Sequence, residues 1–516
     1  MRIIFPSQCP RGCSMNNKSL LLLLIASVFS LPALAATCSD MSRLQINGVT
    51  ISEIESRDSG TLEQRNGPDL SLPPHCRVAA VLSPSDDSEI GMELWLPENW
   101  NGKFLALGNG GWAGSISFSA MAQGLQAGYA VASNDTGHKG GRADFAVGHP
   151  EKLVDFGWRA MHEMTVHSKS MIETFYESAP RLSYYQGCST GGRQGMIAAQ
   201  RFPEDFDAII AGAPVNNQLT LNTTQLYNLK TLIENRSLTL SADEKQLLHD
   251  AVLAACEDTA RGGDGVMDGM LNNPLACDFD PGVLQCSAGE TGTCLSPDQV
   301  QAARQVYAGT FSETGAMLYP GHAKGFELGW RIPAPDAEPT PLQTDATRFI
   351  VYEDPNWDWR EFDLDRDLAL VLDKAGDDIE ALDTDLSAFK ARGGKILFYH
   401  GWNDPGPSPH NTINYYEGVL ETMGSLSDQG ASQEDFMRLF LMPGMGHCRG
   451  GIGPDNADFL GALDAWVEGG IAPDSITASR IREGRVDMTR PLCAYPEAAK
   501  WNGRGNPDDV SSYSCQ

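Results

Sequence analysis

The fold is decided by the stretch Leu182-Ser183-Tyr184-Tyr185-Gln186-Gly187-Cys188-Ser189-Thr190-Gly191. Residues 182–186 predict a strand, and residues 192–202 after the stretch predict a helix. The pentapeptide between them has the form Gly-x-Ser-x-Gly, which is typical of a nucleophile elbow on a tight strand-to-helix turn. The sequence therefore favours Ser189 as an exposed nucleophile over a buried serine at a Gly-rich helix start.

Two cysteines adjoin residues that look catalytic. Cys188 directly precedes Ser189, and Cys448 directly follows His447 in a Gly-rich loop. Bonded half-cystines have Cα atoms about 5.5 Å apart, so a disulfide between them would bring a serine oxygen and an imidazole nitrogen to about 3 Å. The pattern predicts a serine hydrolase whose nucleophile and base are joined covalently.

Asp404 is the predicted orienting acid. It follows a buried strand over 395–400, and His447 follows another strand over 436–442. Sites in open α/β sheets form beyond the carboxyl ends of strands, and the chain order Ser, Asp, His is that of α/β hydrolases. This spacing favours catalysis over a simple Asp-Pro turn. The remaining histidines that we weighed are expected to be structural or to support the site: His138, His162, His400 and His410.

A Gly-rich turn follows an early predicted strand, at Gly108-Asn109-Gly110-Gly111. Backbone N–H groups of such a loop can hold an oxyanion. We expect one N–H donor from Gly110 or Gly111 and a second from Thr190. An ordinary glycine turn without this role would show the same sequence pattern.

The 516-residue chain is long enough for a large core with an insertion. Residues 1–35 are predicted to be a signal peptide, because a short apolar run precedes the cleavage-site pattern Ala33-Leu34-Ala35. Residues 1–14 of this segment precede the signal pattern itself and suggest an over-long start. We predict an α/β fold: an α/β-hydrolase core formed by residues 36–215 and 383–516, with an inserted lid domain at 216–382.

Charge and cysteine usage narrow the class of protein. The net charge of -29 disfavours nucleic acid and anionic membranes as partners. Ten cysteines follow the predicted cleavage site, without a Cys-x-x-Cys pair, which indicates disulfides in a periplasmic or secreted protein rather than a zinc or redox site. The oligomeric state is not readable from the sequence.

One acidic segment is compatible with a cation site. Asp264 and Asp268 lie four residues apart among glycines. Alternating carboxylate and backbone oxygens suit calcium, but on spacing alone a plain acidic loop fits equally well, and no EF-hand loop is present.

Taken together, these motifs resemble the tannase and feruloyl esterase family, which also contains mono(2-hydroxyethyl) terephthalate hydrolase. The resemblance runs over most of the chain after the signal. The blocks that carry it are Tyr185 to Arg193, Arg201 to Asp207, Ala211 to Pro214, Gly393 to Lys395, Tyr399 to Trp402 with Asp404-Pro405, and Pro443 to Cys448.

The resemblance implies an α/β-hydrolase core with a lid and a Ser189–Asp404–His447 triad. It implies the bridge Cys188–Cys448 and four further bridges: Cys38–Cys76, Cys256–Cys277, Cys286–Cys294 and Cys493–Cys515. It also implies a structural calcium in the lid, held by carboxylates of Asp264 and Asp268 and by backbone carbonyls of Val266 and Met270. The first ligand of that pattern would be Glu257 or Asp258, which extra residues separate from Asp264.

We therefore expect a carboxylic ester hydrolase that acts through an acyl-enzyme on a small aromatic ester, of the hydroxycinnamoyl (feruloyl) or galloyl type. A terephthalate monoester hydrolase is the alternative within the class, for which Arg331, Arg348 or Arg360 would meet the free carboxylate. A non-catalytic polyphenol- or glycan-binding module is the alternative of another class, and the intact triad argues against it.

Overall fold

The computed structural model describes residues 37–64, 69–112, 114–258, 261–289, 292–426 and 435–516. The predicted signal peptide lies outside these residues. Within them, no helix combines the length and apolar character that crossing a membrane requires.

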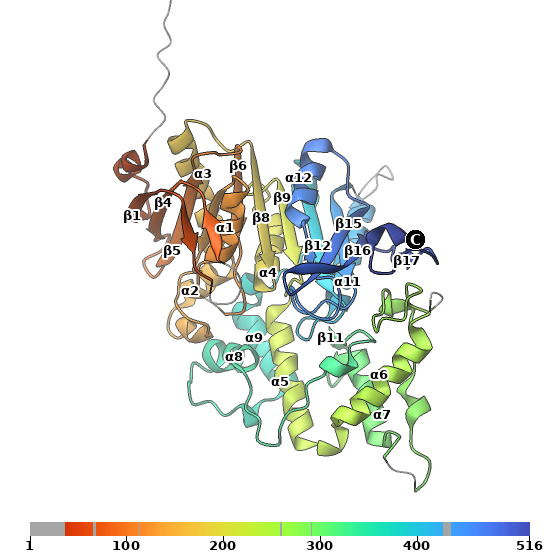
Figure 1. The fold of residues 1–516 in the computed structure, drawn as a ribbon. Coiled ribbons are helices and arrows are strands. Elements are labelled where there is room, and N and C mark those ends of the chain that lie inside the picture. Colours follow the sequence, from red (N-terminus) through yellow and green to blue (C-terminus); the bar gives the residue numbers. More distant parts are fainter. Residues whose placement is uncertain (1–36, 65–68, 113, 259–260, 290–291, 427–434) are drawn as a thin grey trace, which may run out of the picture. The chain divides into compact units, whose positions relative to one another are not determined.

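A nine-stranded sheet forms the core (Figure 1). Its strands, in spatial order, are β1 (Val49–Arg57), β4 (His75–Leu82), β5 (Ile90–Pro97), β7 (Ala130–Asn134), β6 (Lys103–Leu107), β8 (Leu182–Cys188), β9 (Ala208–Gly212), β12 (Lys395–Gly401) and β13 (Met437–Met442). The pairs from β1 to β7 are antiparallel, and those from β7 to β13 are parallel. This mixed sheet confirms the predicted α/β-hydrolase fold.

Both faces of the sheet are covered because its central strands are apolar on both sides. In β6, Phe104 and Ala106 belong to one buried cluster, and Leu105 and Leu107 belong to the other. Helices α3 (Ala160–Tyr176), α4 (Thr190–Arg201) and α11 (Pro409–Leu426) pack into the first cluster, and α1 (Phe118–Gln126) and α12 (Phe459–Gly469) pack into the second. Strands buried on both faces are typical of parallel sheets.

The helix after the elbow begins two residues earlier than the sequence predicts. Thr190 is already helical, because the sharp turn is completed within Ser189 alone. Helix α3 continues from a π-helical turn at Asp155–Arg159, which itself follows the short α2 (Pro150–Val154).

The described residues of the predicted lid segment contribute no strand to the large sheet. Among the described residues between β9 and β12, the elements are α5 (Gln218–Glu234), α6 (Ala242–Cys256), α7 (Pro297–Ala308), the hairpin of β10 (Gly309–Phe311) and β11 (Met317–Pro320), α8 (Pro341–Asp345), α9 (Leu364–Ile379) and α10 (Ser387–Ala391). Part of this segment has its own apolar cluster, which includes Leu248, Val252, Val300 and Trp330. The boundaries 216 and 382 stay a prediction.

Small sheets complete the chain. Near the C-terminus, β14 (Asn456–Ala457), β15 (Ser475–Arg482) and β16 (Arg485–Cys493) form one, and β17 (Ala499–Trp501) pairs with β18 (Tyr513–Cys515). Near the N-terminus, β2 (Gly60–Leu62) pairs with β3 (Leu70–Leu72).

Five disulfides join the ten cysteines of the described chain, in the pairs that the resemblance implies: Cys38–Cys76, Cys188–Cys448, Cys256–Cys277, Cys286–Cys294 and Cys493–Cys515. The bridge between Cys188 and Cys448 spans 260 residues, whereas the other four span 38 or fewer. Long-range covalent restraint of the core is therefore concentrated in one bond.

Removal of this long bridge should cost more stability than removal of a short one. The chain-entropy model assigns about 5.5 kcal/mol to a closed loop of 260 residues and about 2.5 kcal/mol to one of 8. We expect the Cys188→Ala/Cys448→Ala variant to unfold at a lower urea concentration than the matched Cys286→Ala/Cys294→Ala variant. Equal midpoints, followed by tryptophan fluorescence, would contradict this expectation.

Candidate functional site

Ser189 stands at a strained turn between β8 and α4. Its φ of 64° and ψ of -125° lie in a region that residues with side chains avoid. The turn is tight: a Cβ added to Gly187 would lie 2.5 Å from the carbonyl atoms of Gly191. Strain of this kind, on a partly exposed serine, is the backbone signature that the pentapeptide predicts.

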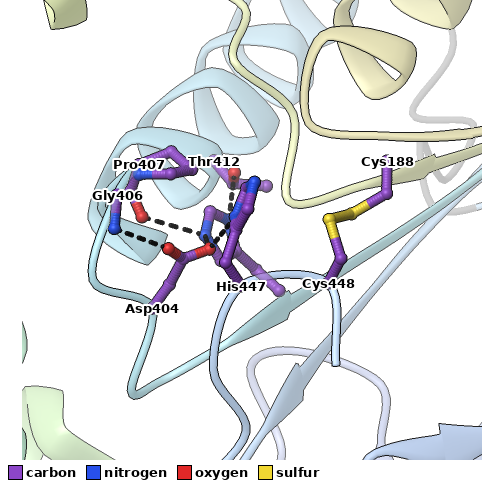
Figure 2. The surroundings of a disulfide bond; sticks show 8 residues. Cys188, Asp404, Gly406, Pro407, Thr412, His447 and Cys448 are labelled. Atoms are coloured by element: carbon purple, nitrogen blue, oxygen red, sulfur yellow. Dashed lines mark hydrogen bonds and ion pairs between the residues drawn. A yellow bond between two sulfur atoms is a disulfide. The ribbon is translucent and has the colours of Figure 1, made fainter. Parts of the chain in front are cut away.

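Asp404 and His447 are in direct contact. Asp404 follows β12 and is fully buried, and its Oδ2 lies 2.7 Å from Nδ1 of His447, which follows β13 (Figure 2). Strands β8, β9, β12 and β13 are parallel, so their carboxyl ends lie on the same side of the sheet. This side therefore carries Ser189, Asp404 and His447. The His447 side chain is one-third exposed, so its ring can meet both the buried acid and a ligand.

The long disulfide joins the elbow to the histidine loop. The Cα atoms of Cys188 and Cys448 are 6.0 Å apart, and Figure 2 shows the sulfur bridge beside His447. Cys448 also has a positive φ, of 62°. A tight turn thus stands at each end of the bridge, with Ser189 and His447 as its immediate neighbours in sequence.

The carboxylate of Asp404 accepts several hydrogen bonds. Its Oδ1 accepts from the N–H of Gly406 at 2.8 Å, and its Oδ2 lies 3.1 Å from Nε2 of His400 as well as near His447. Burial disfavours the charged form, but the hydrogen bonds from His400 and His447 outweigh it and lower the pKa of Asp404 to about 2. The acid is therefore ionised at neutral pH.

The Gly-rich turn after β6 lies against the nucleophile helix. Oγ1 of Thr190 donates to the carbonyl of Gly111 at 3.0 Å. Gln194 and Asn109 exchange two hydrogen bonds, one from the backbone N–H of Asn109 at 3.0 Å and one from Nε2 of Gln194 at 3.1 Å. In the part of the chain that the structure describes, the N–H groups of Gly110, Gly111 and Thr190 have no hydrogen-bond acceptor.

The other histidines take up different positions. His138 bonds the carbonyl of Trp112 at 2.7 Å, His162 bonds Asp205 at 2.8 Å, and His410 bonds the carbonyl of Gly321 at 3.1 Å. Of the four that the sequence set aside, His400 alone contacts Asp404 among the described residues.

Residues of the inserted segment reach the site. A Cβ placed on Gly111 would lie 3.4 Å from Cδ2 of Leu342 in α8, and Oε1 of Gln218 in α5 lies 3.4 Å from Oγ1 of Thr190. Gln218 is almost fully buried, and its Nε2 has no partner among the described residues. Apolar surface and an unused amide donor therefore stand close to the turn after Ser189.

Several polar contacts join the segment between β9 and β12 to the rest of the chain, and two sets of them involve the Asp404 loop and helix α8. The loop after Asp404 contacts β11, because the N–H of Ser408 donates to the hydroxyl of Tyr319 at 3.2 Å and Oγ of Ser408 donates to the carbonyl of Gly321 at 2.5 Å. Helix α8 is fixed by the buried Asp345, which accepts two hydrogen bonds from the Arg142 guanidinium at 2.7 and 2.8 Å.

Sequence reasoning missed several of these residues. Gln194, Gln218, Leu342 and Ser408 lie in no motif identified in the sequence, and Asn109 lies in the Gly-rich turn but was given no role there. His400 had a signal, since it stands four residues before Asp404 within one quoted block.

The three arginines considered for a substrate carboxylate differ. Arg360 pairs with Glu338 and Asp358 at the surface, and Arg331 is exposed. Arg348 is half-buried, and its Nε has no hydrogen-bond partner within the described residues. Arg348 is therefore the one of the three that remains suited to this role.

The acidic segment forms a buried charged cluster. Oδ2 of Asp268 lies 3.0 Å from Nη2 of Arg490, Oδ2 of Asp264 lies 3.8 Å from Nε of the same arginine, and Glu257 is almost fully buried beside them. Burial raises the pKa of Asp264, and burial together with the charge of Asp264 raises the pKa of Asp268 to about 6. Asp258, by contrast, is half-exposed and pairs with Arg261 at 2.8 Å.

The donors of this cluster decide whether it suits calcium. The described residues contain no group of three or more His, Cys, Asp or Glu side chains arranged around a metal position. Two close carboxylates with a buried oxygen of Asp268 that lacks a partner nevertheless suit calcium, provided that backbone carbonyls supply the remaining ligands. The residues present fit the ion in their chemistry, with Glu257 rather than Asp258 facing the cluster.

Comparisons with known proteins identify the family of the chain. Residues 76–516 match the family model described as tannase and feruloyl esterase. An uncharacterized esterase of Xanthomonas campestris pv. campestris is 34% identical, over 95% of this chain and 93% of its own length. A probable feruloyl esterase B-1 of Aspergillus flavus is 34% identical, over 85% and 86% of the two chains.

A solved structure extends the likeness to three dimensions. The crystal structure of feruloyl esterase B from Aspergillus oryzae superposes with a TM-score of 0.83 at 29% identity, covering 93% of this chain and 99% of that one. The match of the family model and the length of these alignments lead to one conclusion: this chain belongs to the tannase and feruloyl esterase family.

Proposed function

We propose that the protein is an exported serine esterase that hydrolyses aromatic carboxylic esters through an acyl-enzyme. Membership of the family makes it a carboxylic ester hydrolase. The observation that carries the serine mechanism is the strained Ser189 tied by the Cys188–Cys448 bridge to a histidine that bonds a buried, ionised aspartate.

The proposed steps follow from the roles of these groups. Ser189 attacks the ester carbonyl while His447 removes its proton, and Asp404 holds the histidine tautomer and stabilises the imidazolium. His447 then protonates the leaving alcohol, and water hydrolyses the acyl-enzyme with the same histidine as base.

The oxyanion needs donors that are not already used. The N–H of Thr190 and that of Gly110 or Gly111 meet this condition within the described residues. Because Thr190 also bonds the carbonyl of Gly111, the two candidate donor segments are held together before substrate binds. Such preorganised donors are usually the largest electrostatic contribution to acyl transfer.

Two features support an aromatic acyl group that carries polar substituents. Leu342 offers an apolar surface next to Gly111, and Gln218 offers a buried amide donor next to Thr190. The name of the relatives, feruloyl esterase B, agrees with a hydroxylated aromatic acid. A terephthalate monoester is the second candidate, because Arg348 has an unpaired donor.

Export to an oxidising compartment, periplasmic or extracellular, is supported by the five disulfides. It accords with the signal peptide predicted at residues 1–35.

We also propose a structural calcium ion at the acidic cluster. Asp264 and Asp268 would supply carboxylate ligands, Val266 and Met270 backbone carbonyls, and Glu257, rather than the half-exposed Asp258, the remaining carboxylate. Glu257, Asp264 and Asp268 carry three negative charges against one positive charge on Arg490. A divalent cation would balance the difference, and its chemistry there is structural rather than catalytic.

Replacing Ser189 by alanine should abolish ester hydrolysis and labelling by a fluorophosphonate probe, because no other group supplies the nucleophile. We expect the kcat of the variant to be lower than that of the wild type by at least about 10⁴-fold. Ser178→Ala, at an exposed serine remote from the site, is the control and should keep full activity. Continued labelling of the Ser189→Ala variant, detected by mass spectrometry, would overturn the assignment.

The substrate class can be tested with methyl ferulate, methyl cinnamate, methyl gallate and a terephthalate monoester. Gln218→Met should lower kcat/KM for the hydroxylated esters by about fivefold relative to methyl cinnamate, since it removes one hydrogen bond of about 1 kcal/mol. An equal loss on all four esters would contradict recognition by Gln218. A preference for the terephthalate monoester that Arg348→Leu abolishes would favour the second candidate.

Chelation should lower the melting temperature if calcium occupies the acidic cluster, and Asp264→Asn should reproduce the loss in calcium-saturated buffer. Glu257→Gln and Asp258→Asn form a matched pair, of which the first is expected to weaken calcium binding and the second to leave it unchanged. Elemental analysis without bound metal, together with an unaltered melt after chelation, would rule the ion out.

A further inference from the structure

His400 is fully buried at the end of β12, four residues before Asp404. Its Nε2 lies 3.1 Å from Oδ2 of Asp404 and 3.1 Å from the carbonyl oxygen of Pro407. Its Nδ1 lies 2.7 Å from Oγ1 of Thr412 (Figure 2 labels Asp404, Pro407 and Thr412). Both ring nitrogens are therefore engaged, although the ring is far from solvent.

These partners assign the proton on the ring. The two neighbours of Nε2, a carboxylate and a carbonyl, can only accept, so Nε2 must carry hydrogen. The hydroxyl of Thr412 can either donate to Nδ1 or accept from it. The environment thus places a hydrogen on Nε2 of His400, shared between Asp404 and Pro407.

The same carboxylate oxygen of Asp404 serves two histidines. Oδ2 accepts from Nδ1 of His447 at 2.7 Å and from Nε2 of His400 at 3.1 Å, while Oδ1 accepts from Gly406. Each hydrogen bond that a carboxylate oxygen accepts withdraws some of the negative charge of that oxygen. The next hydrogen bond to the same oxygen is therefore weaker. The strength of the Asp404–His447 bond therefore depends on His400.

Other titratable groups face this pair from the inserted segment and from α11. Tyr319, His322 and His410 lie close enough to act through their charge, and Lys324 and Glu380 lie behind them. Among the described residues, however, His400 and His447 are the only side chains that donate to the Asp404 carboxylate.

We propose that His400 is a positioning residue of this esterase, which orients Asp404 and moderates its basicity toward His447. The inference rests on the proposed Ser189–Asp404–His447 mechanism. Loss of the His400 donor would let Asp404 turn from its site and would strengthen its charge on the imidazolium of His447.

A pair of isosteric variants tests this role. In His400→Gln, Nε2 of the amide stands as many bonds from Cβ as Nε2 of histidine, so the donor is retained, whereas His400→Met fills similar space without a donor. We expect His400→Met to lower kcat by about tenfold with little change in KM, the effect of one lost hydrogen bond. The acid limb of its kcat/KM profile should move to higher pH by about half a unit or more.

His400→Gln should restore both the rate and the position of the acid limb. A folded His400→Met variant with an unshifted limb would overturn the proposal, and so would equal impairment of the two variants. Labelling of Ser189 by a fluorophosphonate probe separates the two hypotheses: without it the serine mechanism itself fails, and with it an unshifted limb refutes the role of His400 alone.

The wild-type protein provides a test that does not depend on folding of a variant. ¹⁵N-histidine NMR should show one histidine that keeps a hydrogen on Nε2 and that is absent from the spectrum of His400→Gln. Assignment of His400 as the tautomer that carries hydrogen on Nδ1 alone would refute the proposal.

Discussion

The parallel pairing of β8, β9, β12 and β13 is the constraint on which the site depends. Ser189, Asp404 and His447 follow three of these strands and are spread over more than half of the chain. The register of the pairs brings the ends of the strands to one edge, so that Gly401 lies beside Met442 and Cys188 beside Gly212. Every loop that carries a candidate catalytic group therefore begins from an element that is buried on both faces.

At this end of the sheet, polar contacts join neighbouring helices and loops to one another. Thr190 and Gln194 on the nucleophile helix fix the Gly-rich turn, and the Ser408 loop contacts Tyr319 and Gly321 of the insertion. The segment between β9 and β12 thus supports the loop that carries Asp404. Changes in the residues near β11 can be expected to influence Asp404 without touching a ligand.

The sequence predicted the elements that carry strong local patterns. The strands around Phe104, Tyr184, Leu397 and Leu439 could be predicted because apolar runs stand between glycine-rich turns. The nucleophile elbow could be predicted because glycines are required where two backbone segments approach within van der Waals distance. The disulfide from Cys188 to Cys448 followed from adjacency to candidate residues, whereas the other four pairs came from family resemblance.

What the sequence could not show are contacts between distant segments with no motif. Arg490 meets Asp268 across 222 positions, and Ser408 meets Gly321 across 87. Such pairs are set by how helices and loops pack around the sheet, and many side chains could fill each place. The choice between Glu257 and Asp258 is similar: neighbouring residues point in opposite directions, and only the folded backbone shows which of them is buried.

The order of the cysteines along the chain has a consequence for biosynthesis. Four of the five bridges join cysteines that are consecutive in the sequence after the predicted signal peptide, but Cys188 and Cys448 are separated by four others: Cys256, Cys277, Cys286 and Cys294. Because the chain is synthesised from the N-terminus onward, the Cys188 thiol can encounter these four cysteines before Cys448 has been made. Correct pairing must then await the closing of the two local bridges or repair by thiol–disulfide exchange. Maturation of this enzyme is therefore expected to depend on a disulfide isomerase in the compartment where it folds.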